Sequence, residues 1–186
     1  MSHKQERLIN MILKHEGNYC FVKNDSGGET YKGIARRYNP KWSGWKIVDK
    51  NKPLRYNQEI KSTELNNSVF EFYIEKFYNP CKIDEITDLK ISGHLLCHAV
   101  NAGIKPAVKL LQQAINKVYE VQISVDGVIG KKTLSYCNND KTDELIKQFI
   151  VERNAFYTNI TKRKPSQKKF LKGWLNRVKN TTLTCS

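Results

Sequence analysis

The amino-acid sequence predicts a mainly α-helical protein with one small, irregular β region. Apolar residues recur at positions i, i+3 and i+4 near the N-terminus, at 63–79 and through much of the chain beyond residue 89. This period is typical of helices that bury one face. β-like residues and strong turn formers gather between residues 18 and 33 instead. We therefore expect helices to form the core and a hairpin to form a small lobe.

The first predicted helix begins after Ser2, whose hydroxyl suits an N-cap, and stops at Gly17. Glu16 therefore falls in the last helical turn. The negative end of the helix dipole disfavours an ionised carboxylate there, so we expect the pKa of Glu16 to be raised if the site is also partly dry. A raised pKa suits a general acid, but position alone explains a surface carboxylate equally well.

The predicted hairpin carries a second carboxylate, Asp25, in a polar and glycine-rich turn. Gly27 and Gly28 allow positive φ angles, either for a tight turn alone or so that a sugar chain can lie against the backbone. Glycoside hydrolysis requires two carboxyl groups, one to protonate the leaving oxygen and one to deal with the developing positive charge. Glu16 and Asp25 are therefore candidate catalytic residues.

The section at 41–57 is predicted to be a loop and contains Trp42 and Trp45. Exposed tryptophans beside a cleft would stack on sugar rings. Large aromatic side chains more often fill cores, however, so we expect both to be buried. A helix follows at 63–79, and its aromatic residues are expected in the core.

The most apolar segment, 89–119, predicts two helices separated near Asn101. His94, Cys97 and His98 lie on neighbouring turns of the first helix. Such residues can bind a metal, but no HExxH glutamate and no fourth ligand accompany them, so a core or surface role is favoured. We expect no metal and no cofactor. Further helices are predicted at 131–136, 143–157 and 167–179, with a tight turn at Asp126 and Gly127.

The chain has a net charge of +14, and nine basic residues but no acidic one occur from residue 153 to the C-terminus. The positive electrostatic field of such a protein attracts polyanions, either nucleic acid or the anionic polymers of a bacterial envelope. No nucleic-acid-binding motif is present, so we favour envelope polymers. Five widely spaced cysteines predict free thiols. No segment resembles a signal peptide or membrane span, so we expect a soluble protein that is made in the cytosol. We also expect a monomer.

The segments HEGNY and DSGGETYKGI resemble the N-terminal signature of the glycoside hydrolase family 108 N-acetylmuramidases, which supplies a catalytic glutamate. Later segments resemble the family's helical core and C-terminal peptidoglycan-binding region, in the same order: AVNAGIKPAVKLLQQAI, VDGVIGKKTL, ERNAFY and FLKGWLNRV. The resemblance implies a lysozyme-like catalytic domain at 1–100 and a helical peptidoglycan-binding domain at 101–186. It also implies hydrolysis of the β-1,4 bond between N-acetylmuramic acid and N-acetylglucosamine, in the periplasm or outside the cell. The same resemblance implies that the cytosol in which the protein is made is bacterial or phage-infected.

By this resemblance Glu16 is the catalytic glutamate, with Asn18 standing where the family prefers glycine and Cys97–His98 standing where it often has aspartate. Phage-type lysozymes are similar more loosely, because they order a glutamate, an aspartate and a threonine like Glu16, Asp25 and Thr30. In that arrangement the aspartate and threonine hold the attacking water while the glutamate donates a proton. The predicted substrate-binding residues are Tyr19, Gly27, Gly28, Tyr31 and Asn101.

Three other functions stay open at the level of sequence. A lytic transglycosylase would cleave the same polymer but leave 1,6-anhydro ends. A catalytically inactive wall-binding protein is compatible with the same fold, because a lysozyme-like fold can be retained after its catalytic activity is lost. A nucleic-acid-binding module is the least favoured, and it rests on net charge alone.

Overall fold

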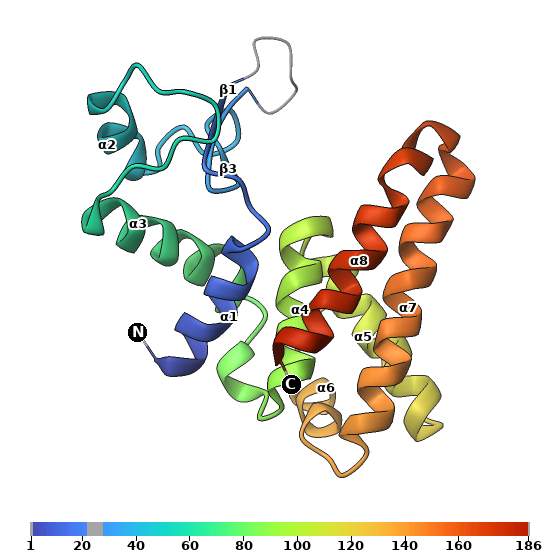
Figure 1. Ribbon diagram of the computed structural model, residues 1–186. Coiled ribbons are helices and arrows are strands. Elements are labelled where there is room, and N and C mark those ends of the chain that lie inside the picture. The colour runs from blue at the N-terminus through green and yellow to red at the C-terminus, as the bar shows by residue number, and fades with distance from the viewer. Residues whose placement is uncertain (1, 22–27, 186) are drawn as a thin grey trace. The chain divides into compact units, whose positions relative to one another are not determined.

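The computed structural model describes residues 2–21 and 28–185, with side chains up to Thr181, and confirms a mainly α-helical fold. The chain divides into two compact units, Met1–Lys76 and Phe77–Ser186 (Figure 1). The first unit contains α1 (His3–Leu13), β1 (Tyr19–Phe21), β2 (Glu29–Tyr31), β3 (Ile34–Ala35), α2 (Gly44–Lys50) and α3 (Thr63–Tyr73). The second contains α4 (Leu89–Ala102), α5 (Ile104–Tyr119), α6 (Lys131–Cys137), α7 (Thr142–Arg163) and α8 (Lys168–Cys185), with short helical turns η2 (Ile83–Glu85) and η3 (Pro165–Gln167). The π-helical turn η1 (Ile74–Tyr78) spans the division.

Helix α1 begins as predicted, with Ser2 as its N-cap. The Ser2 hydroxyl accepts a hydrogen bond from the Gln5 N–H at 3.2 Å, and the Gln5 side chain accepts one from the Ser2 N–H at 2.9 Å. This reciprocal pair satisfies donors that the first helical turn leaves open. The helix ends at Leu13, earlier than predicted, because the backbone then tightens into i to i+3 hydrogen bonds that reach Glu16.

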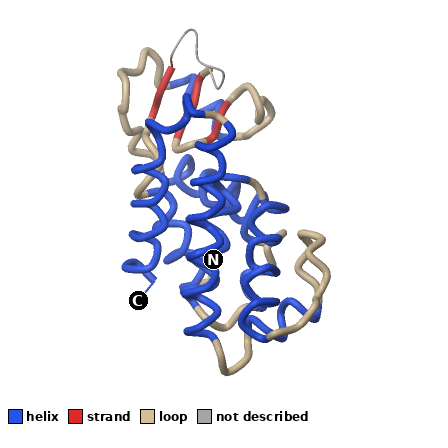
Figure 2. Tube along the Cα trace, turned by 90° about the vertical axis from the view of Figure 1, so that its right-hand side faces the viewer, coloured by secondary structure: helices blue, strands red, loops and turns tan. Residues whose placement is uncertain are grey.

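The predicted hairpin is present as a three-stranded antiparallel sheet in the order β1-β2-β3 (Figure 2). Tyr19 pairs with Tyr31 across β1 and β2, and Tyr31 pairs with Ile34 across β2 and β3. The link between β2 and β3 is a two-residue turn in which Lys32 has φ 48° and Gly33 has φ 78°. Positive φ at both central positions is the geometry that matches the twist of paired strands.

The section at 41–57 is not a loop throughout, because α2 occupies its middle. Trp45 and Val48, one helical turn apart, are both buried and anchor this short helix. The predicted burial of Trp45 is confirmed, since its side chain is 3% exposed. Trp42 is half-buried, and its indole N–H donates to the carbonyl of Ser68 at 3.2 Å.

The second unit is a helical bundle in which α4, α5, α7 and α8 pack on one another (Figure 1). Asp88 caps α4 by accepting a hydrogen bond from the Ile91 N–H at 2.8 Å. The predicted break before α5 is confirmed and falls at Gly103. Helices α7 and α8 extend further than predicted, to Arg163 and Cys185. In the described part of the chain no helix has the length and apolarity needed to cross a membrane.

A turn at Asp126 and Gly127 is present as predicted, and a buried glutamine fixes it to α5. The Gln112 side chain donates to the Asp126 carboxylate at 2.8 Å and to the Val128 carbonyl at 3.1 Å. Its oxygen accepts a hydrogen bond from the Gly127 N–H at 2.9 Å. Since a buried amide with satisfied partners holds its neighbours in one arrangement, this loop is locked onto the helix.

Candidate active site

The predicted general acid, Glu16, lies in the bend that follows α1 and is half-buried. Its carboxylate is placed against the turn between β2 and β3. A Cβ atom built on Gly33 would lie 2.6 Å from the Glu16 Oε2 atom and 2.7 Å from the Tyr73 hydroxyl. The carboxylate of Glu16 and the phenol of Tyr73 therefore both lie beside Gly33 in the β2–β3 turn.

Tyr73 comes from the last turn of α3 and reaches this point from the core, with 2% of the residue exposed. Its hydroxyl donates to the Lys32 carbonyl at 2.8 Å. Burial raises the pKa of Tyr73, and the negative charge of Glu16 raises it further. The phenol is therefore neutral at any physiological pH, and its proton is directed at the turn that carries Gly33. Tyr73 was expected only as a core aromatic.

The second predicted carboxylate, Asp25, and the predicted substrate-binding Gly27 lie outside the described residues. Thr30 is at the centre of β2, half-buried and paired with Cys20 and Ala35. Because side chains alternate along a strand, Thr30 faces away from the side occupied by Glu29 and Tyr31.

The other predicted substrate-binding residues fall in different environments. Tyr31 is fully buried, and its hydroxyl accepts a hydrogen bond from the Ile60 N–H at 3.2 Å, which gives it a packing role. Gly28 directly precedes β2 with φ 62°. Asn101 is exposed in the last turn of α4, in the second unit, and donates to the Cys97 carbonyl at 2.7 Å. The binding roles of these residues stay predictions.

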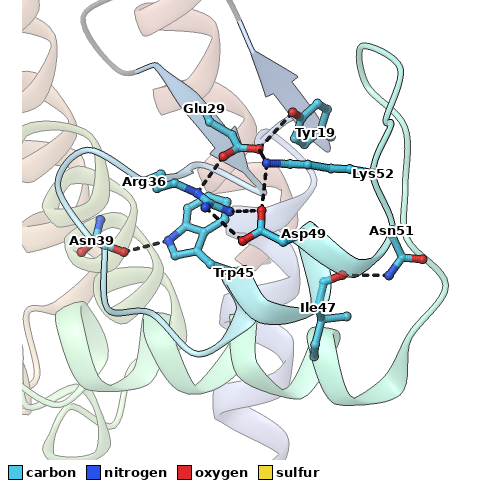
Figure 3. A network of polar contacts seen from close by, with 9 residues as sticks. All are labelled: Tyr19, Glu29, Arg36, Asn39, Trp45, Ile47, Asp49, Asn51 and Lys52. Carbon is cyan, nitrogen blue, oxygen red and sulfur yellow. Dashed lines mark hydrogen bonds and ion pairs between the residues drawn. The ribbon is translucent and has the colours of Figure 1, made fainter.

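A network of ion pairs that sequence reasoning missed joins the sheet to α2 (Figure 3). The Glu29 carboxylate accepts a hydrogen bond from the Tyr19 hydroxyl at 3.0 Å and contacts Arg36 and Lys52, each at 2.7 Å. The same two cations contact Asp49, at 2.7 Å and 2.8 Å. Two carboxylates thus share two cations, which fixes the small lobe that carries the β2–β3 turn.

An aromatic ring from α2, that of Trp45, packs against one cation of the network, Arg36. The Arg36 guanidinium lies 4.4 Å from the centre of the Trp45 ring, in the geometry of a cation–π contact. The Trp45 indole N–H donates to the Asn39 carbonyl at 2.8 Å (Figure 3). Glu29 is therefore a structural carboxylate, because both of its oxygens are already engaged by cations.

We expect the network to stabilise the protein above the acid range. Hydrogen bonds from Arg36 and Lys52 lower the pKa of Asp49 from 3.8 to about 2. A depressed folded-state pKa adds stability above the unfolded value, and this stability is lost as the pH falls from about 4 to about 2. Because Asp49 is half-exposed, the effect should be about 1 kcal/mol or less. In urea unfolding, Asp49→Asn should be less stable than wild type at neutral pH, and the difference should shrink as the pH falls through about 2. A constant difference across that range would contradict the assignment.

Two of the three residues considered for a metal site, His94 and Cys97, contact other polar side chains in the second unit. His94 contacts the guanidinium of Arg153, which is fully buried. Burial, and to a smaller extent the charge of Arg153, lowers the pKa of His94 and of His98 to about 3. The Thr181 hydroxyl lies 3.4 Å from the Cys97 sulfur. Within residues 2–21 and 28–185, no group of three or more His, Cys, Asp or Glu side chains is placed to hold a metal ion.

The chain thus combines a mainly helical, lysozyme-like fold with a small antiparallel sheet, and Glu16 lies beside the β2–β3 turn of that sheet. Residues 9–103 match the family described as "Glycosyl hydrolase 108", and the chain therefore belongs to this family. Residues 106–179 match a second family, described as "Predicted Peptidoglycan domain". The protein is thus a peptidoglycan hydrolase of the glycoside hydrolase class.

Among solved structures, SagA from Brucella abortus has a similar fold over almost the whole length of both chains. It is 23% identical to this protein, with a TM-score of 0.67, and the match covers 97% of this chain and 92% of that chain. No curated protein matches the sequence. The match to the glycoside hydrolase family ends at residue 103, and the match to the peptidoglycan family begins at residue 106. The two compact units, however, divide after Lys76. The predicted domain boundary near residue 100 therefore stays a prediction.

Proposed function

We propose that the protein is an N-acetylmuramidase that cleaves the β-1,4 bond between N-acetylmuramic acid and N-acetylglucosamine, with Glu16 as general acid. The observation that carries this proposal is the placement of the Glu16 carboxylate against Gly33, beside the neutral hydroxyl of Tyr73. The side chain is half-buried, so part of it remains accessible to a substrate.

In the proposed reaction, protonated Glu16 gives its proton to the glycosidic oxygen as the bond to the muramic acid carbon breaks. The sugar ring develops oxocarbenium character, which the second carboxylate stabilises directly or through a water molecule. We assign that role to Asp25, with Thr30 orienting the water. Glu29 is not an alternative, because its carboxylate is engaged by Arg36 and Lys52.

Affinity for the wall would come from two sources in this proposal. The second unit contributes the region that matches the peptidoglycan domain. The net charge of +14 adds a long-range attraction to anionic envelope polymers. Phage lysis and bacterial secretion would each use such an enzyme.

Mass spectrometry of digested peptidoglycan tests the reaction type. We expect disaccharide peptides with reducing N-acetylmuramic acid ends, because a water molecule completes hydrolysis. Products ending in 1,6-anhydro-muramic acid would instead identify a lytic transglycosylase. Intact peptidoglycan after binding would identify a wall-binding protein without activity.

A further inference from the structure

The second unit carries an elongated groove between α5 and α7, far along the sequence from Glu16. A hollow of about 360 Å³ at one end adjoins a smaller one of about 180 Å³, and both are lined by Leu110, Gln113 and Phe156. The two helices pack closely and run in opposite directions (Figure 1). We call this feature the α5–α7 groove.

The floor and the rim of the α5–α7 groove differ in chemistry. Its floor at the larger end is apolar and consists of Pro106, Leu110 and Phe156. Its rim there carries Lys105 and Lys109, one helical turn apart on α5. Arg163 lies at the C-terminal end of α7 and lines the smaller hollow. Since the helices are antiparallel, the positive charge of Arg163 lies toward the end of the groove at which α5 begins.

The two lysines are held in place by the locked loop that follows α5. A Cβ atom on Gly127, which has φ 82°, would lie 2.6 Å from the Lys105 Cγ and 3.3 Å from the Lys109 Cγ. The loop therefore packs directly on both lysine stems. The nearby Asp126 carboxylate is engaged by Gln112 and by the Val128 N–H. Such preorganisation lowers the entropy lost when a ligand is bound.

We propose that the α5–α7 groove binds the stem peptide of peptidoglycan, with a free peptide carboxylate on Lys105 and Lys109. Small aliphatic side chains of the peptide would rest on the apolar floor. This inference builds on the proposed function, because the ligand is part of the same polymer that Glu16 would cleave.

The composition of the larger hollow favours a peptide over the other parts of the cell envelope. The smaller hollow is more polar and includes Glu152, whose carboxylate is engaged by Lys117 at 2.7 Å. A glycan strand needs many hydrogen-bonding partners, and the larger hollow offers the Gln113 side chain and the two lysines against an otherwise apolar lining. A phosphodiester polymer would use the cations but gain nothing from Leu110 and Phe156. A short aliphatic peptide that ends in a carboxylate uses both the floor and the rim.

NMR titration of the full chain tests this inference. The probe is an N-acetylated stem peptide ending in D-alanine, with its C-terminus either free or amidated. We expect the free acid to bind about tenfold more tightly than the amide, because the amide cannot form a charge-assisted hydrogen bond. The double variant Lys105→Gln/Lys109→Gln should bind the free acid about tenfold more weakly than wild type does, and its affinity for the amide should be almost unchanged.

Two further variants separate the groove from general charge. Lys131→Gln/Lys132→Gln removes the same charge from exposed positions of α6 and should leave binding unchanged. Gln113→Trp fills the groove from an exposed position without changing charge, and it should abolish binding of both peptides. Equal affinity for the acid and the amide, or an equal loss of affinity in the α6 variant, would overturn the inference. Binding of poly(glycerol phosphate) to the groove without any binding of the peptides would overturn it as well.

Digestion of purified walls by the wild-type chain, measured in parallel, keeps the two proposals apart. Walls that are digested to reducing ends while no stem peptide binds would refute the groove assignment and leave the proposed function standing. Walls that remain intact would refute the proposed function, and the peptide titration would then decide the groove on its own.

Discussion

Replacing Glu16 with glutamine is expected to reduce the rate of wall digestion by about a hundredfold to ten-thousandfold, the usual contribution of a general acid. The amide has nearly the shape of the carboxylic acid but has no acidic proton to give to the leaving oxygen. Because Glu16 lies in a bend beyond the end of α1, the change should disturb no helical hydrogen bond. The rate is measured as loss of turbidity of purified peptidoglycan.

Glu64→Gln provides the matched control for this variant. Glu64 is an exposed glutamate in the first turn of α3, within the same unit, and the substitution removes the same charge. We expect wild-type turbidity loss from it. Circular dichroism of Glu16→Gln should match wild type, so that lost activity is not lost folding. A folded Glu16→Gln protein with near wild-type activity would refute the assignment of the general acid.

Periodicity in the sequence was sufficient to predict the helical fold but not the position of Glu16 relative to its helix. The Ser2 cap, the hairpin and the break at Gly103 are local features, each governed by neighbouring residues. The end of α1 is different, because the backbone keeps turning through His15 and Glu16 with a tighter hydrogen-bond pattern. Such a change leaves no trace in the spacing of apolar residues.

The surroundings of Glu16 depend on contacts between residues distant in sequence, which explains why they were not predicted. Tyr73 lies on the apolar face of α3, and its sequence context does not distinguish it from the neighbouring phenylalanines, although its hydroxyl reaches the β2–β3 turn. The pairs of Arg36 with Glu29 and with Asp49 follow no helix or strand period. Within this network, as far as the described residues go, Asp49 and Lys52 are the one pair of ions three residues apart, a spacing that indicates an ion pair on a helix.

The basic C-terminal stretch shows that a count of charges does not define a surface. Arg153 was counted among the residues that attract polyanions, yet its side chain is fully buried and contacts His94. Lys105 and Lys109 lie outside that stretch, yet they line the α5–α7 groove, and of the basic stretch itself Arg163 joins them there. Position in the fold therefore decides which positive charges can meet a ligand.

Gly33→Ala is the second substitution for which we expect a large effect, and it acts through Glu16 without altering any catalytic atom. A Cβ at this position would overlap the Glu16 carboxylate, at 2.6 Å, and the Tyr73 hydroxyl, at 2.7 Å. Tyr73 is fixed by its buried ring and its hydrogen bond to Lys32, so the more flexible glutamate must move. A displacement of about 1 Å of a catalytic group lowers kcat by about a hundredfold.

The backbone cost of this substitution must be separated from the collision. Gly28→Ala serves for the stability measurement, because Gly28 also has positive φ, at 62°, but a new Cβ there has no atom of residues 2–21 or 28–185 within 4 Å. In urea unfolding, each alanine variant should have a free energy of unfolding about 1 kcal/mol below wild type, because alanine disfavours the left-handed backbone conformation. Gly33→Ala should lose more than this, because its Cβ also collides with other side chains. Its fall in kcat should exceed what this loss of folded protein explains, since most molecules remain folded. Wild-type kcat in folded Gly33→Ala would mean that the position of the Glu16 carboxylate beside this turn does not matter for catalysis.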